Sequence, residues 1–241
     1  MGDAWSALQA RKRANPGAPL VTYVDTARGE RVELSSTSVE NAAAKIANAL
    51  RDEFDCEAGA RVSISLPMHW QRTAWCAGIW TAGCLLALDD LGTTDLTVLD
   101  EHSALTSSST AGEVVAVSLH PFGLPISAVL PSGIQDATVS VRNQPDAYLF
   151  EPPLPSYPAL VWNAEERSQE QVLDQAAALA ARWGLSAGGR LLVAGGIDLV
   201  DAWLACLAVP LVTGGSVVLA TGDVDADVIV AAERITAVAS P

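Results

Sequence analysis

Apolar residues recur at helical spacing between residues 37 and 54, and polar residues fill the opposite face. The apolar positions are Val39, Ala43, Ile46, Ala47, Leu50 and Phe54. This spacing predicts a helix with one face in solvent. Thr37 and Glu40 have the spacing of a capping box, in which each side chain satisfies a backbone donor of the other residue, so we expect the helix to begin there.

A strand, a buried helix and a second strand are predicted next. Residues 61–66 alternate between polar and apolar side chains and are followed by Pro67. Residues 71–82 are apolar nearly all round, which predicts a helix that is covered on most sides. Gly83 ends this helix, and residues 84–88 have the composition of a buried strand.

The same order of elements returns later in the chain. Ser168 and Gln171 match a capping box before a helix at 168–183, and the pattern then predicts a strand at 191–193, an apolar helix at 199–211 and a strand at 216–219. A gap-free shift that places Arg61 on Arg190 superposes residues 39–62 on 168–191. Six positions are then identical, namely Ala47/Ala176, Ala49/Ala178, Leu50/Leu179, Ala58/Ala187, Gly59/Gly188 and Arg61/Arg190.

This internal repeat predicts an α/β fold of two similar subdomains, with mostly parallel sheets flanked by helices. Residues 91–158 are less regular, with a Ser- and Thr-rich loop at 107–110 and a strand at 114–117. The segment 151–158 contains four prolines and predicts a stiff connector without helix or ladder potential. We therefore expect a first subdomain at residues 1–150 and a second at 151–241, packed as one globular unit.

Several segments share spacing and residue types with the start of adenylate-forming enzymes, the acyl-CoA synthetase or AMP-binding superfamily. The chain resembles that family in A-P-L-V-T-Y-V-D at 18–25, G-E-R-V-E-L at 29–34, A-G-A-R-V-S-I-S-L-P at 58–67 and A-G-I-W-T-A-G at 77–83. Residues 207–218 and 233–241 are similar to later family segments. The resemblance implies the N-terminal subdomains of such an enzyme.

The family's phosphate loop, Y-T-S-G-T-T-G-x-P-K-G-V, corresponds to F-E-P-P-L-P-S-Y-P-A-L-V at 150–161. Glycine-rich backbone curls its N–H groups around an anion, whereas prolines remove those donors and Glu151 repels phosphate. Ala159 stands at the position of the lysine. The family's later segments, with the adenine loop, magnesium ligand, ribose-binding aspartate and catalytic lysine, would follow Pro241. The resemblance therefore implies a truncated pseudoenzyme, without catalytic or cofactor-binding residues and without a cofactor.

The net charge of −14 and the pI near 4.4 argue against nucleic acids and anionic membranes as partners. No apolar run is long enough for a membrane span, and the start of the chain does not look like a signal peptide. The cysteines, Cys56, Cys76, Cys84 and Cys206, form no CxxC pair, which favours core packing over redox or metal chemistry. We expect a cytoplasmic protein.

Other candidate chemistry is weighed against simpler explanations. His120 follows a strand and either holds a ligand or forms a turn; His69 either faces a pocket or starts an aromatic-rich helix. His102 lies in an acidic segment and is expected in solvent. Asp89 and Asp90 follow a strand end, where a Mg²⁺ site or a chance acidic pair are the alternatives. The hydrolase, zinc-protease and dinucleotide motifs are absent from the sequence.

Three functional hypotheses remain open from the sequence. The first is a non-catalytic remnant that acts as a homodimer or with another protein partner, through apolar surface that a third subdomain would otherwise cover. The second is a binder of an acyl, aromatic acid or CoA-type small molecule without adenylation, with the Trp-rich helices lining its cavity. The third is an AMP-dependent ligase by family analogy.

Overall fold

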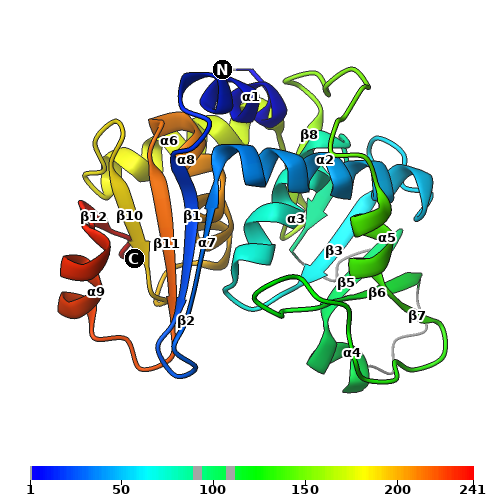
Figure 1. The fold of residues 1–241 in the computed structure, drawn as a ribbon. Coiled ribbons are helices and arrows are strands. Elements are labelled where there is room, and N and C mark those ends of the chain that lie inside the picture. The colour runs from blue at the N-terminus through cyan, green and yellow to red at the C-terminus, as the bar shows by residue number, and fades with distance from the viewer. Residues whose placement is uncertain (1, 89–93, 107–111) are drawn as a thin grey trace.

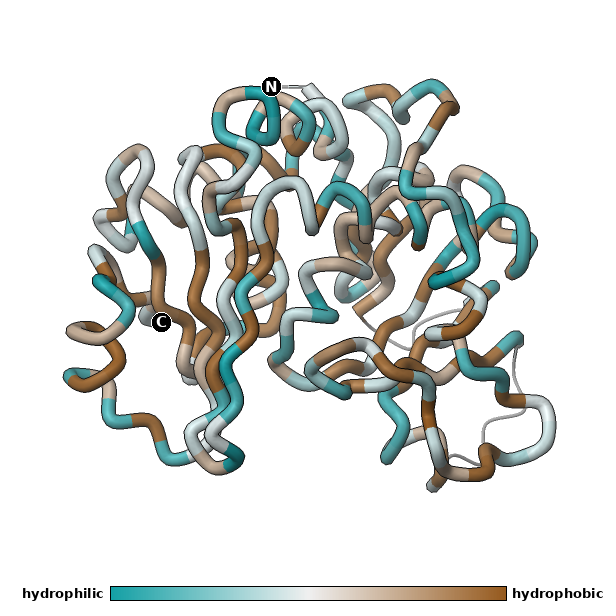
Figure 2. The backbone as a smooth tube through the Cα atoms, viewed as in Figure 1, coloured by the Kyte–Doolittle hydropathy of each residue, from teal (hydrophilic) through white to brown (hydrophobic). Residues whose placement is uncertain are grey.

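Two β-sheets flanked by helices lie side by side (Figure 1). The computed structural model describes residues 2–88, 94–106 and 112–241. Within these residues, one sheet has the strand order β7-β6-β5-β3-β4-β8-β9, here called the β3 sheet, and the other has the order β12-β10-β11-β1-β2, here called the β10 sheet. Figure 2 shows that apolar residues concentrate on the strands and the helices packed against them.

The helices and strands have the following bounds. The helices are α1 (Ala4–Ala14), α2 (Ser36–Asp52), α3 (Trp70–Thr81), α4 (Glu101–Thr106), α5 (Ala137–Asn143), α6 (Gln169–Arg182), α7 (Leu199–Cys206), α8 (Ala208–Thr213) and α9 (Ala226–Glu233). The strands are β1 (Pro19–Asp25), β2 (Glu30–Ser35), β3 (Arg61–Ser65), β4 (Leu85–Ala87), β5 (Leu96–Asp100), β6 (Glu113–Val117), β7 (Ile134–Asp136), β8 (Pro158–Trp162), β9 (Glu165–Ser168), β10 (Arg190–Val193), β11 (Ser216–Thr221) and β12 (Ala237–Val238).

Each sheet is parallel except for one antiparallel strand at its edge. β1 and β2 form a hairpin, but β1 pairs in parallel with β11, with Val21 opposite Val217. In the same way β8 and β9 form a hairpin, and β8 pairs in parallel with β4, with Leu86 opposite Leu160. The two units therefore exchange hairpins, and each sheet contains strands from both sides of residue 151. The predicted fold class, two similar α/β units with mostly parallel sheets, is confirmed.

The start of α2 differs from the prediction. Ser35, not Thr37, is the N-cap, and its hydroxyl accepts a hydrogen bond from the Ser38 N–H at 3.1 Å. The Thr37 hydroxyl donates to the Pro16 carbonyl, and Glu40 pairs with Lys12 at 2.7 Å. Thr37 and Glu40 thus have tertiary partners at Pro16 and Lys12 instead of capping each other. The helix begins at Ser36, ahead of the predicted start. The capping box of Ser168 and Gln171 is confirmed at the start of α6.

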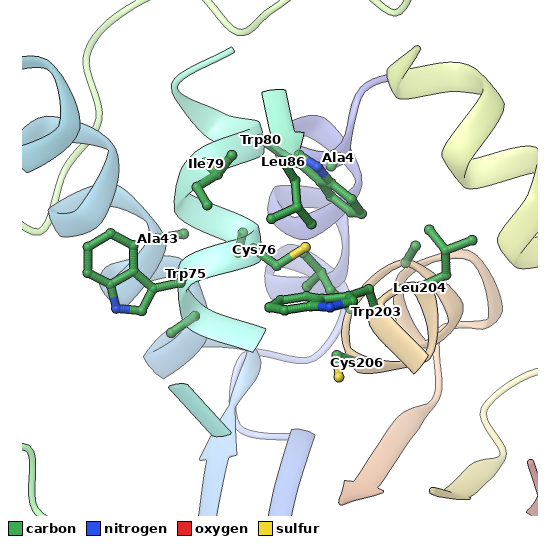
Figure 3. Packing of buried hydrophobic residues seen from close by; sticks show 14 of the residues in the cluster. Ala4, Ala43, Trp75, Cys76, Ile79, Trp80, Leu86, Trp203, Leu204 and Cys206 are labelled. Carbon is green, nitrogen blue, oxygen red and sulfur yellow. The ribbon is translucent and has the colours of Figure 1, made fainter. Parts of the chain in front are cut away.

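The buried helix α3 packs closely against α2. Gly78 makes this approach possible, because a Cβ at this position would overlap the Ile46 side chain. Figure 3 shows Trp75 projecting from α3 toward α2, while Cys76 faces Trp203 of α7 on the other side. Both tryptophans are buried, as is α3 on nearly all sides. The all-round apolar pattern of residues 71–82 was therefore a correct indication of burial.

The apolar helix predicted at 199–211 is two short helices. α7 ends at Cys206 and α8 begins at Ala208, with Leu207 between them at φ −137°. Pro210 is the physical reason, because proline has no N–H and its ring clashes with the carbonyl of the residue four positions earlier, here Cys206. The Cys206 carbonyl instead accepts a hydrogen bond from the Thr73 hydroxyl at 3.1 Å. The carbonyl freed at the break thus forms a hydrogen bond between the two units.

Some elements carried no clear sequence signal. β5 and α4 lie in the region expected to be irregular, and β8 begins at Pro158, which had been assigned to the connector. Proline is tolerated as the first residue of a strand, and the register of β8 with β9 shifts just after it. The Ser- and Thr-rich segment at 107–110 lies outside the described residues.

Candidate functional site

A cavity of about 590 Å³ opens where the two units meet, and it is here called the inter-unit cavity. It lies at the carboxyl ends of β3, β4 and β8, the side on which open parallel sheets place their ligands. The second unit contributes α7. The lining residues are Ser63, Ile64, Ser65, Leu66, Arg72, Ala87, Leu88, Trp162, Asn163, Leu199 and Trp203. Arg72 is the only charged side chain among these described lining residues.

Packing fixes the orientation of Arg72. Its guanidinium carbon lies 4.4 Å from the ring centre of Trp203, within cation–π range, and one of its terminal nitrogens donates to the Leu66 carbonyl at 2.6 Å. Its Nε is buried and has no acceptor among the described residues. The guanidinium is therefore held in a fixed position at the cavity wall, with its Nε enclosed by protein.

The four cysteines provide no reactive group. All are buried and free. Burial raises the pKa of Cys56 and of Cys84 to about 12 and that of Cys206 to about 11, and it raises the pKa of Cys76 as well. These thiols therefore stay protonated at neutral pH, whereas nucleophilic attack and metal binding require the thiolate. Their position in the core agrees with the packing interpretation.

The segment that corresponds to the phosphate loop offers few backbone donors. Pro152, Pro153 and Pro155 have no N–H, and the Tyr157 N–H is already bonded to the Leu154 carbonyl at 2.9 Å. The Pro155 and Tyr157 carbonyls accept from the first N–H groups of α6. Ala159 is fully buried in β8, where its carbonyl accepts from the Trp80 indole at 2.8 Å.

This segment also borders a cavity of about 810 Å³, here called the connector cavity. Three carboxylates line it, those of Asp55, Glu57 and Glu151, against the single guanidinium of Arg51. The Arg51 guanidinium is engaged with the Phe150 ring, 3.2 Å from its centre. Such surroundings repel a polyphosphate, since like charges at short range disfavour each other.

His69 is a buried N-cap of α3, which agrees with the helix-start interpretation. Its Nδ1 accepts from the Gln71 N–H at 3.2 Å, and its ring lies edge-on to Tyr23 at 4.4 Å. Burial, followed by the nearby positive charge of Arg28, lowers the pKa of His69 to about 4. The imidazole is therefore neutral at physiological pH, and its Nε2 has no partner among the described residues.

The other predicted candidates do not converge on a site. His120 is exposed and its Nδ1 accepts from the Phe122 N–H at 3.1 Å, as a turn residue does. His102 is exposed on α4. Asp89 and Asp90 lie outside the described residues. Across the described part of the chain, no cluster of three His, Cys, Asp or Glu residues has the arrangement of a metal site.

Sequence reasoning did not identify Arg72, Trp162 or Asn163. Arg72 is the single charged residue in an otherwise largely apolar helix, which was the available signal. Trp162 ends β8, and Asn163 opens the tight turn to β9 with a positive φ of 51°. Their meeting with Arg72 depends on the hairpin exchange.

Comparison with known proteins gives one relative by sequence and many by structure. No protein-family model matches the chain. A protein of Mycobacterium tuberculosis (strain ATCC 25618 / H37Rv) described as a TIGR03089 family protein is 41% identical over 211 residues, which is 83% of this chain and 84% of that protein.

The solved structures show the fold. An acyl-CoA synthetase of Brucella canis superposes with a TM-score of 0.76 at 17% identity, over 99% of this chain and 47% of its own length. An acetoacetyl-CoA synthetase of Streptomyces lividans gives 0.71 at 16% identity, over 91% and 38%. The N-terminal domain of FACL13 from Mycobacterium tuberculosis gives 0.71 at 13% identity, over 98% and 62%. The chain thus spans about half the length, or less, of the two synthetases, and matches their N-terminal subdomains in fold.

Proposed function

The chain belongs to the TIGR03089 family, and from that premise we propose that it is a non-catalytic protein with the adenylate-forming fold that works through association with a second copy of itself. One observation carries the proposal: residues 149–157, which overlap the place of the phosphate loop at 150–161, combine poor anion-binding chemistry with an apolar outer surface. Prolines and carboxylates replace the donors that a nucleotide needs.

The apolar outer surface consists of four side chains, here called the connector patch. Leu149 is 88% exposed, Leu154 59%, Phe150 41% and Tyr157 40%. Prolines stiffen the segment, so little conformational entropy is lost when it is covered. Large exposed apolar side chains that gather in one segment are typical of an interface. Among assemblies of one chain, a twofold dimer that uses the same patch on both copies is the commonest arrangement.

Light scattering at micromolar concentration tests the association. We expect the mass of a dimer for the wild type and of a monomer for the double variant Leu149→Ser, Leu154→Ser. The matched control is Phe122→Ser, Val129→Ser, which removes two exposed apolar side chains from another loop and should remain dimeric. A monomeric wild type would contradict self-association, and a dimer in both variants would place the interface elsewhere.

Calorimetric titration with Mg-ATP and AMP tests the non-catalytic part separately. We expect no saturable heat, because Pro152, Pro153 and Ala159 stand where the phosphate-binding donors and the lysine would be. Micromolar binding, or turnover of ATP with a carboxylic acid, would favour an AMP-dependent ligase instead.

The inter-unit cavity favours a second candidate function, the binding of an acyl or aromatic acid without adenylation. Its tryptophan walls suit an apolar group, and the positive charge of Arg72 suits a carboxylate. Titration with fatty acids, aromatic acids and acyl-CoAs tests this function, and Trp203→Leu should weaken any binding. Failure of all three ligand classes to bind the wild type would exclude it.

We propose the reducing cytoplasm as the location of the protein. No helix among the described residues combines the length and apolar character needed to cross a bilayer.

A further inference from the structure

The connector cavity opens within the connector patch. Leu154 and Tyr157 belong to both, since their side chains are exposed in the patch and also line the cavity of about 810 Å³. Glu151 lies between the patch residues Phe150 and Leu154 in the sequence and lines the same cavity. A second copy that covers the patch therefore also covers the mouth of this cavity.

The carboxylates of the cavity have no positive partner. Asp55, Glu57 and Glu151 are exposed, and none of them forms an ion pair with another described residue. Arg51 is the one basic residue of the described lining, and its guanidinium lies over the Phe150 ring. The lining is therefore net negative.

The negative charge continues on the surface next to the cavity. Glu53 and Asp146 are exposed and lie close in sequence to the lining residues. Asp52 lies 3.7 Å from Arg51 and offsets its positive charge. Each copy also carries a net charge of −14. When the same patch is used on both copies, like charges therefore meet across the interface, and this opposes association.

The apolar and the charged parts of this surface respond differently to salt. Burial of Leu149 and Leu154 drives association, and this contribution does not depend on a charge. Repulsion between exposed carboxylates acts over the Debye length, which is about 30 Å at 0.01 M and about 8 Å at 0.15 M ionic strength. The repulsion thus spans the interface at low salt and is largely screened at the higher concentration.

We propose that the carboxylates of the connector cavity make self-association depend on ionic strength, so that the dimer forms when cations screen Asp55, Glu57 and Glu151. This inference rests on the proposed self-association through the connector patch and adds the regulation of that same site. Its sign is opposite to that of an interface with complementary charges, which salt weakens. The apolar side chains supply the affinity, and the carboxylates set the ionic strength at which the dimer forms.

Analytical ultracentrifugation of a dilution series measures the dissociation constant of the dimer. For the wild type we expect this constant to fall on the order of tenfold between about 0.01 M and about 0.15 M NaCl. The triple variant Asp55→Asn, Glu57→Gln, Glu151→Gln should dimerise at low salt about as tightly as the wild type does at high salt. These side chains are exposed and are replaced by neutral amides of similar shape, so the fold should be retained.

The matched control removes the same number of negative charges from another part of the surface. Its substitutions are Glu101→Gln, Asp223→Asn and Asp227→Asn, at exposed residues on or beside α4 and α9. Figure 1 shows these two helices on the opposite side of the molecule from the start of β8, which follows the connector. This control should keep the salt dependence of the wild type, because the local carboxylates remain.

The outcomes separate this inference from the one on which it rests. Wild type and triple variant that are both monomeric at both salt concentrations contradict the proposed self-association, and this inference with it. A wild-type dimer whose dissociation constant is unchanged or raised by salt overturns the present inference and leaves self-association standing. The same holds for a triple variant that keeps the salt dependence of the wild type.

Discussion

Arg61 and Arg190 occupy equivalent places in the two units, but their surroundings differ. Each begins an interior parallel strand of its sheet, β3 or β10, and reaches a glutamate on the hairpin received from the other unit. Arg61 lies 3.6 Å from Glu166, whose side chain is 53% exposed. Arg190 lies 3.4 Å from Glu33 and 2.7 Å from Glu233, and it also donates to the Thr22 hydroxyl at 2.8 Å.

The difference shows how one repeated residue acquires two roles. Around Arg190, Arg31 bonds both Glu33 and Glu233, so a network ties β10, the β1–β2 hairpin and the end of α9 together. The hydrogen bond from Arg31, followed by that from Arg190, lowers the pKa of Glu233 against the opposing effect of burial. Around Arg61 the pairing is a single long contact with a largely exposed glutamate, which contributes little to stability.

The buried helices of the two units differ in the same way. α3 is continuous, and its N-cap His69 is buried and hydrogen-bonded. The equivalent position in the second unit is Asp198, an exposed N-cap whose side chain makes no capping bond. Gly78 lets α3 approach α2, whereas the second unit has Leu207 and the break before Pro210. The first unit therefore has the better capped and more closely packed buried helix. The second unit has the stronger hydrogen-bond network at its hairpin.

The largest expected effect concerns the buried N-cap of the first unit. The folded-state pKa of His69 is lowered to about 4, below its usual 6.5, so the unfolded state binds the proton more readily. Stability should be full above pH 6.5 and fall as the pH drops toward 4, by up to about 3 kcal/mol. Urea unfolding between pH 7 and pH 4 measures this loss.

His69→Asn keeps a capping acceptor and removes the titrating group, so its stability should depend less on pH over this interval. Asp198→Asn is the comparison from the second unit and should leave the wild-type pH dependence in place. Identical pH profiles for the wild type and His69→Asn would contradict the assignment to His69.

The next effect separates the two arginines. Arg190→Gln removes charge-assisted hydrogen bonds to Glu233 and Glu33 in a site where the arginine is 15% exposed, and it should lower the free energy of unfolding by roughly 1.5–3 kcal/mol. Arg61→Gln should cost less than about 1 kcal/mol, as expected for an exposed pair. Equal losses in denaturant titrations would show that the Arg190 network is no stronger than the Arg61 contact.

The smallest effect tests the bond that links the units at the helix break. Thr73→Val keeps the shape of the side chain and leaves the buried Cys206 carbonyl without its hydroxyl donor, at a cost of roughly 1–2 kcal/mol. Thr81→Val is the matched control on the same helix, because the Thr81 hydroxyl donates to the Ala77 carbonyl within α3. Thermal unfolding should show a larger loss for Thr73→Val than for Thr81→Val, and the reverse order would exclude a special role for the break.

The sequence by itself determined the order and type of most elements. The periodicity at 37–54 and 168–183, the all-round apolar run at 71–82 and the capping box at Ser168 are local patterns, and local hydrogen bonding and burial are enough to realise them. The cysteines and His69 also follow local patterns. The cysteines pack in the core and His69 starts a helix, as the simpler of the two interpretations predicted for each. The inter-unit cavity was harder to predict, because Arg72 is visible in the sequence but its contacts with Leu66 and Trp203 are not.

Only the tertiary structure decided which strands pair and which residues meet. β1 and β8 join the sheet of the other unit because a strand's hydrogen-bonding partner is set by the packing of whole units, and side-chain periodicity carries no information about it. The same exchange brings Trp162 to Arg72 and Arg190 to Glu33. Long-range contacts also moved the start of α2 to Ser36, where Pro16 and Lys12 satisfy side chains that a local reading had assigned to a capping box.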